Sequence, residues 1–171
     1  MGNVIEFRNI TKYFPGVKAL DDISFTANGG EVLALMGENG AGKSTLLKVL
    51  NGDYQQTSGE YLVNGEPCHF NSPREAVAAG IGVIYQERQI MLELTVGENI
   101  FLGRLPTGFM GRIKMREVHS RAQAIIDEFG LDMKSTDKVK DLSVAYQQMV
   151  EIMKAYSREN LKMIALSLIH I

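Results

Sequence analysis

The chain has 171 residues, of which 45% are hydrophobic, and its formal net charge at pH 7 is -2. This length can bury one sizeable core, and we expect one domain or most of one. The weak net charge gives no electrostatic footprint for nucleic acid or for an anionic membrane surface. The single cysteine, Cys68, excludes an internal disulfide framework. These features favour a soluble intracellular protein.

The beginning of the chain has the pattern of an α/β sheet. Residues 4–10 (VIEFRNI) and 21–27 (DDISFTA) predict strands. The turn sequence NGG at 28–30 leads into EVLALM, residues 31–36, which predicts a short buried strand. A glycine-rich loop and an apolar helix pattern through Leu50 follow.

Turn and cap residues mark the elements that come next. Residues 59–70 predict a hairpin that turns at the Asn-Gly pair 64–65. A serine cap followed by a proline, residues 72–73, begins a helix that Gly80 ends. The run IGVIY, residues 81–85, predicts another buried strand.

Strand signals are absent from about Glu87 to Lys140. Thr95 and Glu98 have the spacing of a capping box. An apolar stripe closed by Gly130 indicates the core-facing side of a helix rather than a ligand site. We therefore expect an α/β fold interrupted by a mostly helical insert. The stripe consists of Met115, Val118, Ala122, Ile125, Ile126 and Phe129.

Residues 37–44, GENGAGKS, match the pattern G-x-x-x-x-G-K-[ST] between a predicted strand and a predicted helix. Such glycines let successive backbone N–H groups face one concavity that binds phosphate oxygens. Lys43 would reach the β- and γ-phosphates, and the Ser44 hydroxyl would ligate Mg²⁺. A glycine-rich turn without a ligand is the alternative, but the placement favours a nucleoside triphosphate site. The predicted binding positions are Gly37, Glu38, Asn39, Gly40, Ala41, Gly42, Lys43, Ser44 and Thr45.

Five segments together resemble ABC-type ATPases, and in particular the first ATPase half of the tandem subunits that power bacterial sugar importers of the ribose, galactose and xylose type. They are FPGVKALDDISF, GENGAGKSTLLKVLNGDY, GIGVIYQE, LTVGENIFLGR and DLSVAYQQMVEI, in the family's order. The resemblance extends from about Val4 to Tyr156. It implies a P-loop NTPase core with N-terminal antiparallel strands (1–86), a helical subdomain (87–140), and a signature helix followed by a truncated strand (141–171).

The resemblance assigns roles to further positions. Phe14 matches the aromatic residue that stacks on adenine, with Tyr13 or an ordinary core role as the alternatives. Gln86 matches the glutamine that helps to bind Mg²⁺ and orients the attacking water, with a plain polar strand end as the alternative. Ser143 can cap the next helix, whose N-terminus would bind the γ-phosphate held by an opposing ATPase domain. The signature consists of Leu142, Ser143, Val144, Ala145 and Tyr146, and the last three replace Gly, Gly and Gln.

The family pattern next requires a strand that ends in Asp-Glu-Pro. That aspartate holds the Mg²⁺ shell, and that glutamate polarises the water. Here LKMIA is followed by LSLIHI, which places Leu166, Ser167 and Leu168 at the expected positions. None of them carries a carboxylate, so no catalytic residue is assigned. We expect a fragment that cannot hydrolyse ATP alone.

The leading hypothesis is an ATP-binding subunit of an ABC importer that energises carbohydrate uptake. The resemblance implies ATP and Mg²⁺, a second ATPase half, a membrane permease that contacts the region Gln86–Arg104, and indirectly a periplasmic sugar-binding protein. It implies a cytoplasmic position, peripheral on the inner face of the membrane, with no nucleic-acid partner. The alternatives are a soluble ABC-type ATPase that acts on ribosomes or in DNA repair, and a non-hydrolysing ATP sensor.

Overall fold

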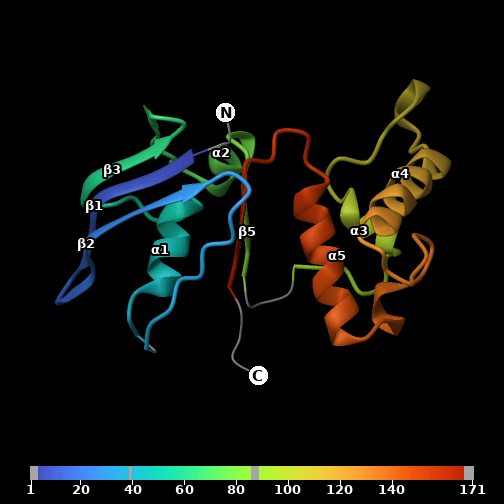
Figure 1. Ribbon diagram of the computed structural model, residues 1–171. Helices are drawn as coiled ribbons and strands as arrows, with labels where there is room; N and C mark the ends of the chain where they lie inside the picture. The colour runs from blue at the N-terminus through green and yellow to red at the C-terminus, as the bar shows by residue number, and fades with distance from the viewer. Residues whose placement is uncertain (1–3, 39, 86–88, 168–171) are drawn as a thin grey trace. The chain divides into compact units, whose positions relative to one another are not determined.

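The computed structural model describes residues 4–38, 40–85 and 89–167, and these form two compact units (Figure 1). The first, called the sheet unit, contains the described residues up to Val83 together with Asn160–Ser167. The second, called the helical unit, contains the described residues of Ile84–Glu159. No helix in the described part of the chain is long and apolar enough to cross a bilayer.

An antiparallel sheet with the strand order β2-β1-β3-β4 forms one part of the sheet unit. Its strands are β1 (Val4–Phe14), β2 (Val17–Asn28), β3 (Ser58–Val63) and β4 (Glu66–Pro67). The central strand β1 pairs with β2 on one edge and with β3 on the other. The Asn-Gly pair 64–65 joins β3 to β4, so the predicted hairpin is confirmed.

Stacked aromatic rings fill the buried face of this sheet. Phe7 stands opposite Phe25 on β2 and Tyr61 on β3, and its ring centroid lies 4.7 Å from each of theirs. Helix α1 (Lys43–Leu50) packs four apolar side chains into the same core. Burial raises the pKa of the Tyr61 phenol, because the charged form loses its hydration. This packing holds α1 in the sheet unit.

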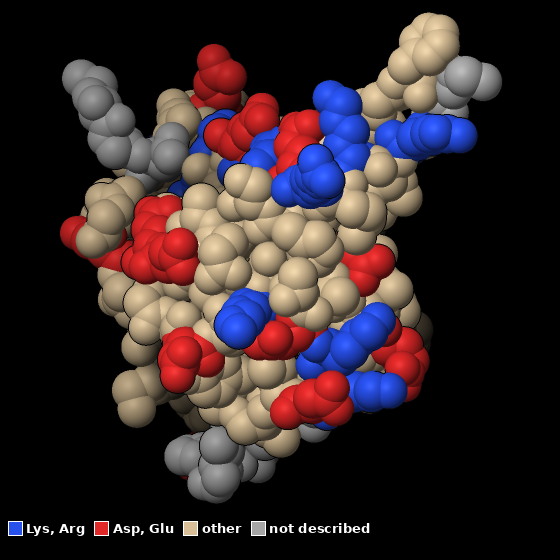
Figure 2. All heavy atoms as spheres, turned by 90° about the vertical axis from the view of Figure 1, so that its right-hand side faces the viewer, with Lys and Arg blue, Asp and Glu red and all other residues tan. Residues whose placement is uncertain are grey.

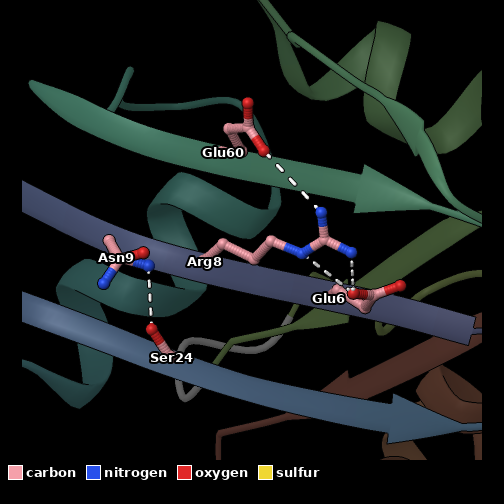
Figure 3. A network of polar contacts seen from close by, with 5 residues as sticks. All are labelled: Glu6, Arg8, Asn9, Ser24 and Glu60. Carbon is pink, nitrogen blue, oxygen red and sulfur yellow. Dashed lines mark hydrogen bonds and ion pairs between the residues drawn. The ribbon is translucent and has the colours of Figure 1, made fainter.

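The opposite face of β1 is polar and carries a bulge. Asn9 has a positive φ of 54°, and the register with β2 shifts at this point. Its backbone N–H donates to the Ser24 hydroxyl at 2.8 Å (Figure 3). The Arg8 guanidinium lies 2.6 Å from the Glu6 carboxylate and 3.9 Å from that of Glu60 on β3. Such exposed pairs add little stability, so the aromatic core dominates the energetics of this sheet.

The sheet unit also contains a helix and a second, two-stranded sheet. Helix α2 (Pro73–Ala78) begins with the predicted cap, since the Ser72 hydroxyl accepts from the Glu75 N–H at 3.4 Å. Strand β5 (Ile81–Ile84) pairs with β6 (Met163–Leu166). The predicted helix start and the strand at residues 81–85 are therefore confirmed.

The prediction of a buried strand at residues 31–36 is wrong. Residues 31–38 have no regular secondary structure, and the side chains of Val32 and Met36 are 100% and 91% exposed. An apolar run becomes a buried strand only when neighbouring strands take up its backbone hydrogen bonds. Neither sheet of the described residues includes this segment.

The helical unit contains α3 (Val96–Ile100), α4 (Met115–Glu128) and α5 (Val144–Tyr156). Two short 3₁₀ turns, η1 (Phe109–Gly111) and η2 (Val139–Asp141), lie between them. Within the described residues no strand occurs from β5 to β6, which confirms the predicted helical insert.

The core of the helical unit lies where α3 meets α4 and α5. Of the predicted stripe, Val118, Ala122 and Ile126 are fully buried. Ile125 and Phe129 pack against them, whereas Met115 lies at the surface at the first turn of α4. The stripe is thus confirmed except at Met115, which is exposed at the start of the helix.

The capping box is confirmed at the start of α3. The Thr95 hydroxyl accepts from the Glu98 N–H at 3.3 Å, and the Glu98 carboxylate accepts from the Thr95 N–H at 2.8 Å. Both interactions are formed by residues three positions apart, which explains why the sequence alone could predict them.

Candidate functional site

The glycine-rich loop enters α1 through a residue that only glycine fits. Gly42 is the N-cap of α1 and has a left-handed backbone with φ of 84°. A Cβ at this position would also collide with the carbonyl oxygen of Ala19 on β2. Both the conformation and the space require glycine here, so the loop is fixed against the sheet where the helix begins.

The N-terminus of α1 has the features of an anion-binding site. No side chain caps it, and its first turn contains no acidic residue. The first backbone N–H groups of a helix lack intrahelical partners, and the helix dipole makes this end positive. The Ser44 side chain, in the same turn, is exposed. This end of α1 therefore offers hydrogen-bond donors, a hydroxyl and positive potential to an oxyanion.

Lys43 points back into the loop that precedes it. Its ammonium donates to the carbonyl oxygens of Gly37 at 2.5 Å and Glu38 at 2.7 Å. The Ala41 N–H also donates to the Glu38 carbonyl, at 3.1 Å. The structure thus brings Gly37, Glu38 and Lys43 together, whereas Asn39 lies outside the described residues. A phosphate group would take over donors that now hold the loop closed.

Phe14, at the end of β1, is part of an aromatic and cationic cluster. Its ring meets that of Tyr54 edge-on, with centroids 5.2 Å apart. The Lys12 ammonium lies 5.2 Å from the Phe14 centroid and 5.9 Å from that of Tyr54. Lys48 of α1 lies 5.1 Å from the Tyr54 centroid, which connects this cluster to the helix that follows the loop. Tyr13 lies outside it, with Lys18 5.5 Å from its ring centroid.

Sequence reasoning missed Tyr54 and Lys12 as neighbours of Phe14. Tyr54 follows the end of α1, and Lys12 is two residues before Phe14 on the same strand. The period of two along β1 was a usable signal for Lys12, because residues i and i+2 lie on one face. The position of Tyr54 depends on how α1 packs on the sheet, which no local pattern reports.

The signature segment begins α5 in the helical unit. The Ser143 hydroxyl accepts from the Tyr146 N–H at 3.4 Å, so the predicted cap is confirmed. Ser143, Val144 and Ala145 are exposed, whereas Tyr146 packs against the core of this unit. The buried Gln147 donates to the carbonyl oxygens of Leu142 and Val139, both at 3.1 Å, and anchors the preceding turn.

Only some of the remaining predicted positions lie among the described residues. Gln86 and Leu168 lie outside the described residues. Strand β6 ends at Leu166, and neither it nor Ser167 carries a carboxylate. Across the described ranges no group of three or more His, Cys, Asp or Glu side chains could hold a metal ion. The loop and the N-terminus of α1 therefore fit a phosphate group. Of the two predicted Mg²⁺ ligands, Ser44 lies among the described residues.

Comparison with other sequences extends over most of the chain. Residues 20–165 match the profile of a family described as "ABC transporter". The arabinose import ATP-binding protein AraG 1 of Burkholderia ambifaria is 51% identical over 166 residues, which are 97% of this chain and 33% of that protein. The arabinose import ATP-binding protein AraG of Vibrio parahaemolyticus is 51% identical over 154 residues, 90% of this chain and 30% of its own length. The chain thus spans about a third of the length of these relatives.

Solved structures match the fold over nearly the whole chain. A nucleotide-free ATP-binding cassette from an ABC transporter aligns with a TM-score of 0.77 at 28% identity, over 96% of this chain and 68% of its own. The ADP conformation of MJ1267, an ATP-binding cassette of an ABC transporter, aligns with a TM-score of 0.78, with the same identity and coverage. The α/β fold predicted from the sequence is therefore confirmed.

Proposed function

Because this chain belongs to the ABC transporter family, we propose that it is the ATP-binding part of an importer subunit that energises carbohydrate uptake. The observation that carries this proposal is the uncapped N-terminus of α1, with the Lys43 ammonium enclosed by the loop before it. The names of the relatives, arabinose import ATP-binding proteins, support a sugar as the transported substrate.

In the proposed site, the triphosphate lies along the loop from Gly37 to Thr45. Its oxygens accept hydrogen bonds from the loop and helix N–H groups, and Lys43 exchanges its two carbonyl partners for phosphate oxygens. Phe14 stacks on the adenine. Ser44 and Gln86 hold Mg²⁺, which when bound neutralises charge on the phosphates.

The N-terminus of α5 is a second helix end that is exposed to solvent, and it supports a partner for this chain. The signature residues at the N-terminus of α5 bind the γ-phosphate held by an opposing ATPase half, and their exposure supports this. A membrane permease contacts the region Gln86–Arg104, and a periplasmic sugar-binding protein delivers the substrate to that permease. The subunit is then cytoplasmic and peripheral on the inner face of the membrane.

This chain alone is proposed to bind ATP without useful turnover. Positioned acid–base groups contribute typically 10²–10⁴-fold to such reactions. Leu166 and Ser167, where the family has its two carboxylates, supply none. A non-hydrolysing ATP sensor would have the same residues, and the relatives' names favour the importer over it.

Isothermal titration with ATP and with AMP tests the site. The two ligands share the adenine, but AMP lacks the β- and γ-phosphates that the loop and Lys43 are proposed to bind. We expect saturable ATP binding and AMP binding that is at least ten-fold weaker. Equal affinities would contradict a phosphate cradle at residues 37–45.

The sequence of the complete gene and of its neighbours tests the proposal that this chain belongs to an importer. We expect it to encode a second, related ATPase half, beside genes for a permease and a periplasmic sugar-binding protein. A single ATPase half encoded beside ribosomal or DNA-repair genes would support the soluble alternative instead.

A further inference from the structure

The loop Leu105–Lys114 between α3 and α4 is closed by its own backbone. The Lys114 N–H donates to the Pro106 carbonyl at 2.9 Å, and the Gly108 N–H donates to the Arg112 carbonyl at 2.7 Å. The two arms are therefore paired and support the turn η1 between them. In Figure 1 this loop stands away from α4 at the upper right.

The tip of this loop presents an aromatic ring to solvent. The Phe109 side chain is 91% exposed. Ile113, on the returning arm, and Met115, at the start of α4, are also among the exposed large apolar residues. A lone exposed apolar side chain is common, but here two lie on the loop and a third begins the helix that follows it.

The same segment is strongly basic. Between Phe101 and Glu117 the sequence contains no Asp or Glu. Arg112, Lys114 and Arg116 are all exposed. Figure 2 shows blue Lys and Arg atoms along the top of this face, interspersed with red Asp and Glu atoms, and a tan projection at the upper right. The net charge of -2 for the whole chain conceals this local excess of positive charge. The basic residues of the segment are Arg104, Arg112, Lys114 and Arg116.

Acidic neighbours compensate this charge only in part. The Glu117 carboxylate lies 3.4 Å from the Lys114 ammonium and 3.8 Å from the Arg121 guanidinium. Among the ion pairs of the described residues, none involves Arg112 or Arg116. These two guanidinium groups, on either side of Ile113, remain available to an anionic surface.

We propose that the loop Leu105–Lys114 binds the surface of an anionic lipid bilayer, with Phe109 inserted among the headgroups and Arg112, Lys114 and Arg116 close to the lipid phosphates. Aromatic rings partition favourably into the bilayer interface. Each basic side chain near an anionic leaflet strengthens binding several-fold. Because this loop carries both an exposed aromatic ring and basic side chains, the ring can enter the interface while the cations contact the phosphates.

A bilayer suits this surface better than a folded protein partner does. The exposed apolar side chains described here are Phe109, Ile113 and Met115, which form a small patch, whereas a stable protein interface buries about 800 Å² on each partner. Lipids adapt to a small wedge and place negative charge around it. One ring and three cations give weak binding, so the loop orients a protein that other contacts also hold at the membrane. This inference does not depend on nucleotide binding.

The absence of tryptophan from the chain permits a direct test. Phe109→Trp introduces one indole at the tip, and its emission reports entry into the bilayer interface. We expect a saturable blue shift with vesicles of equal parts phosphatidylglycerol and phosphatidylcholine, and little with phosphatidylcholine alone. High salt should reverse the shift, because the attraction is screened. Val17→Trp, at a position 59% exposed on the sheet unit, is the control and should show no shift.

Charge-reversal variants form the second part of the vesicle experiment. In the Phe109→Trp background, Arg112→Glu combined with Arg116→Glu should weaken vesicle binding at least ten-fold. Arg74→Glu combined with Lys134→Glu changes the net charge equally at other exposed positions and should change binding less than two-fold. Equal losses in both pairs, or no blue shift with anionic vesicles, would overturn the proposal. A shift with soluble polyglutamate but not with vesicles would assign the loop to an acidic protein partner instead.

Discussion

The ammonium group of Lys43 lies 2.5 Å from the carbonyl oxygen of Gly37. The side chain of the helix's first residue thus closes the loop that leads into the helix. A phosphate oxygen can replace this carbonyl, and a charge-assisted bond to phosphate is the stronger of the two. The cradle therefore holds its cation in place before any ligand arrives.

Replacement of this cation should weaken nucleotide binding. We expect Lys43→Ala to cost about 1.5–3 kcal/mol of ATP binding free energy, as for a charged hydrogen bond. Isothermal titration measures the loss. Lys134→Ala, which removes a lysine from an exposed position of the helical unit, is the control and should bind as the unmodified chain does. Unchanged affinity in Lys43→Ala would remove Lys43 from the site.

The aromatic cluster at the end of β1 makes a second prediction. Phe14→Leu keeps an apolar side chain beside Tyr54 but removes the ring, and should cost on the order of 1 kcal/mol of ATP binding. Tyr13→Leu should have a smaller effect. Thermal unfolding of both variants checks that neither loses the fold. A larger loss of affinity in Tyr13→Leu would show that Tyr13 is the stacking residue.

The capping box of α3 predicts a pH-dependent contribution to stability. Hydrogen bonds from the Thr95 backbone N–H and, secondarily, from its hydroxyl lower the pKa of Glu98 below its usual range. A lowered pKa in the folded state means that this stability is fully present above the unfolded-state pKa of about 4.3 and is lost as the pH falls through the folded value.

Glu98→Gln keeps the hydrogen-bond acceptor but removes the charge, so it should reduce the free energy of unfolding at neutral pH by about 0.3–1 kcal/mol, the range for a carboxylate near a helix N-terminus. Urea titrations should show this difference shrinking from about pH 5 towards pH 2. Glu60→Gln, in the exposed pair with Arg8 at 3.9 Å, is the control and should change stability little. A difference that stays constant over this pH range would contradict the role given to Glu98.

The exposed apolar segment at residues 31–36 should promote self-association. Val32 and Met36 present their side chains to solvent beside a backbone that no strand of the described residues pairs. We expect Val32→Lys combined with Met36→Lys to reduce both dye binding to exposed apolar surface and aggregation measured by light scattering. The matched pair Val17→Lys and Val144→Lys should reduce them less. If both pairs of substitutions reduced dye binding and aggregation equally, the surface that drives self-association would lie outside residues 31–36.

An assay of phosphate release from ATP distinguishes ATP binding from ATP hydrolysis. We expect the purified chain to bind ATP but to release phosphate only at a residual rate, because Leu166 and Ser167 provide neither carboxylate of the family's site. A version extended with the family's Asp-Glu-Pro-Thr segment and its remaining strands should hydrolyse ATP faster. Vigorous hydrolysis by the chain itself, abolished by Lys43→Ala, would contradict this, and Glu87→Gln would then be the first variant to test.

Features that depend on a few neighbouring residues were predictable from the sequence. The caps at Ser72, Thr95 and Ser143 form through bonds between residues three positions apart. The turn at Asn64-Gly65 and the glycine at Gly42 reflect backbone conformations that few residues adopt. Local sterics and local hydrogen bonds determine such features, so the caps and turns followed from the sequence, whereas β1 and β2 extend beyond the predicted ranges 4–10 and 21–27 because pairing between the strands sets their length.

Features that depend on distant partners were decided by the tertiary structure alone. Residues 31–36 have the composition of a core strand, but a strand also needs neighbours for its backbone, and none of the described strands provides them. Tyr54 meets Phe14 only because α1 packs on the sheet. Phe109 is apolar by sequence, and the pairing of the two loop arms places it at an exposed tip. Burial is a property of what surrounds a residue, and the chain sets those surroundings only when it folds.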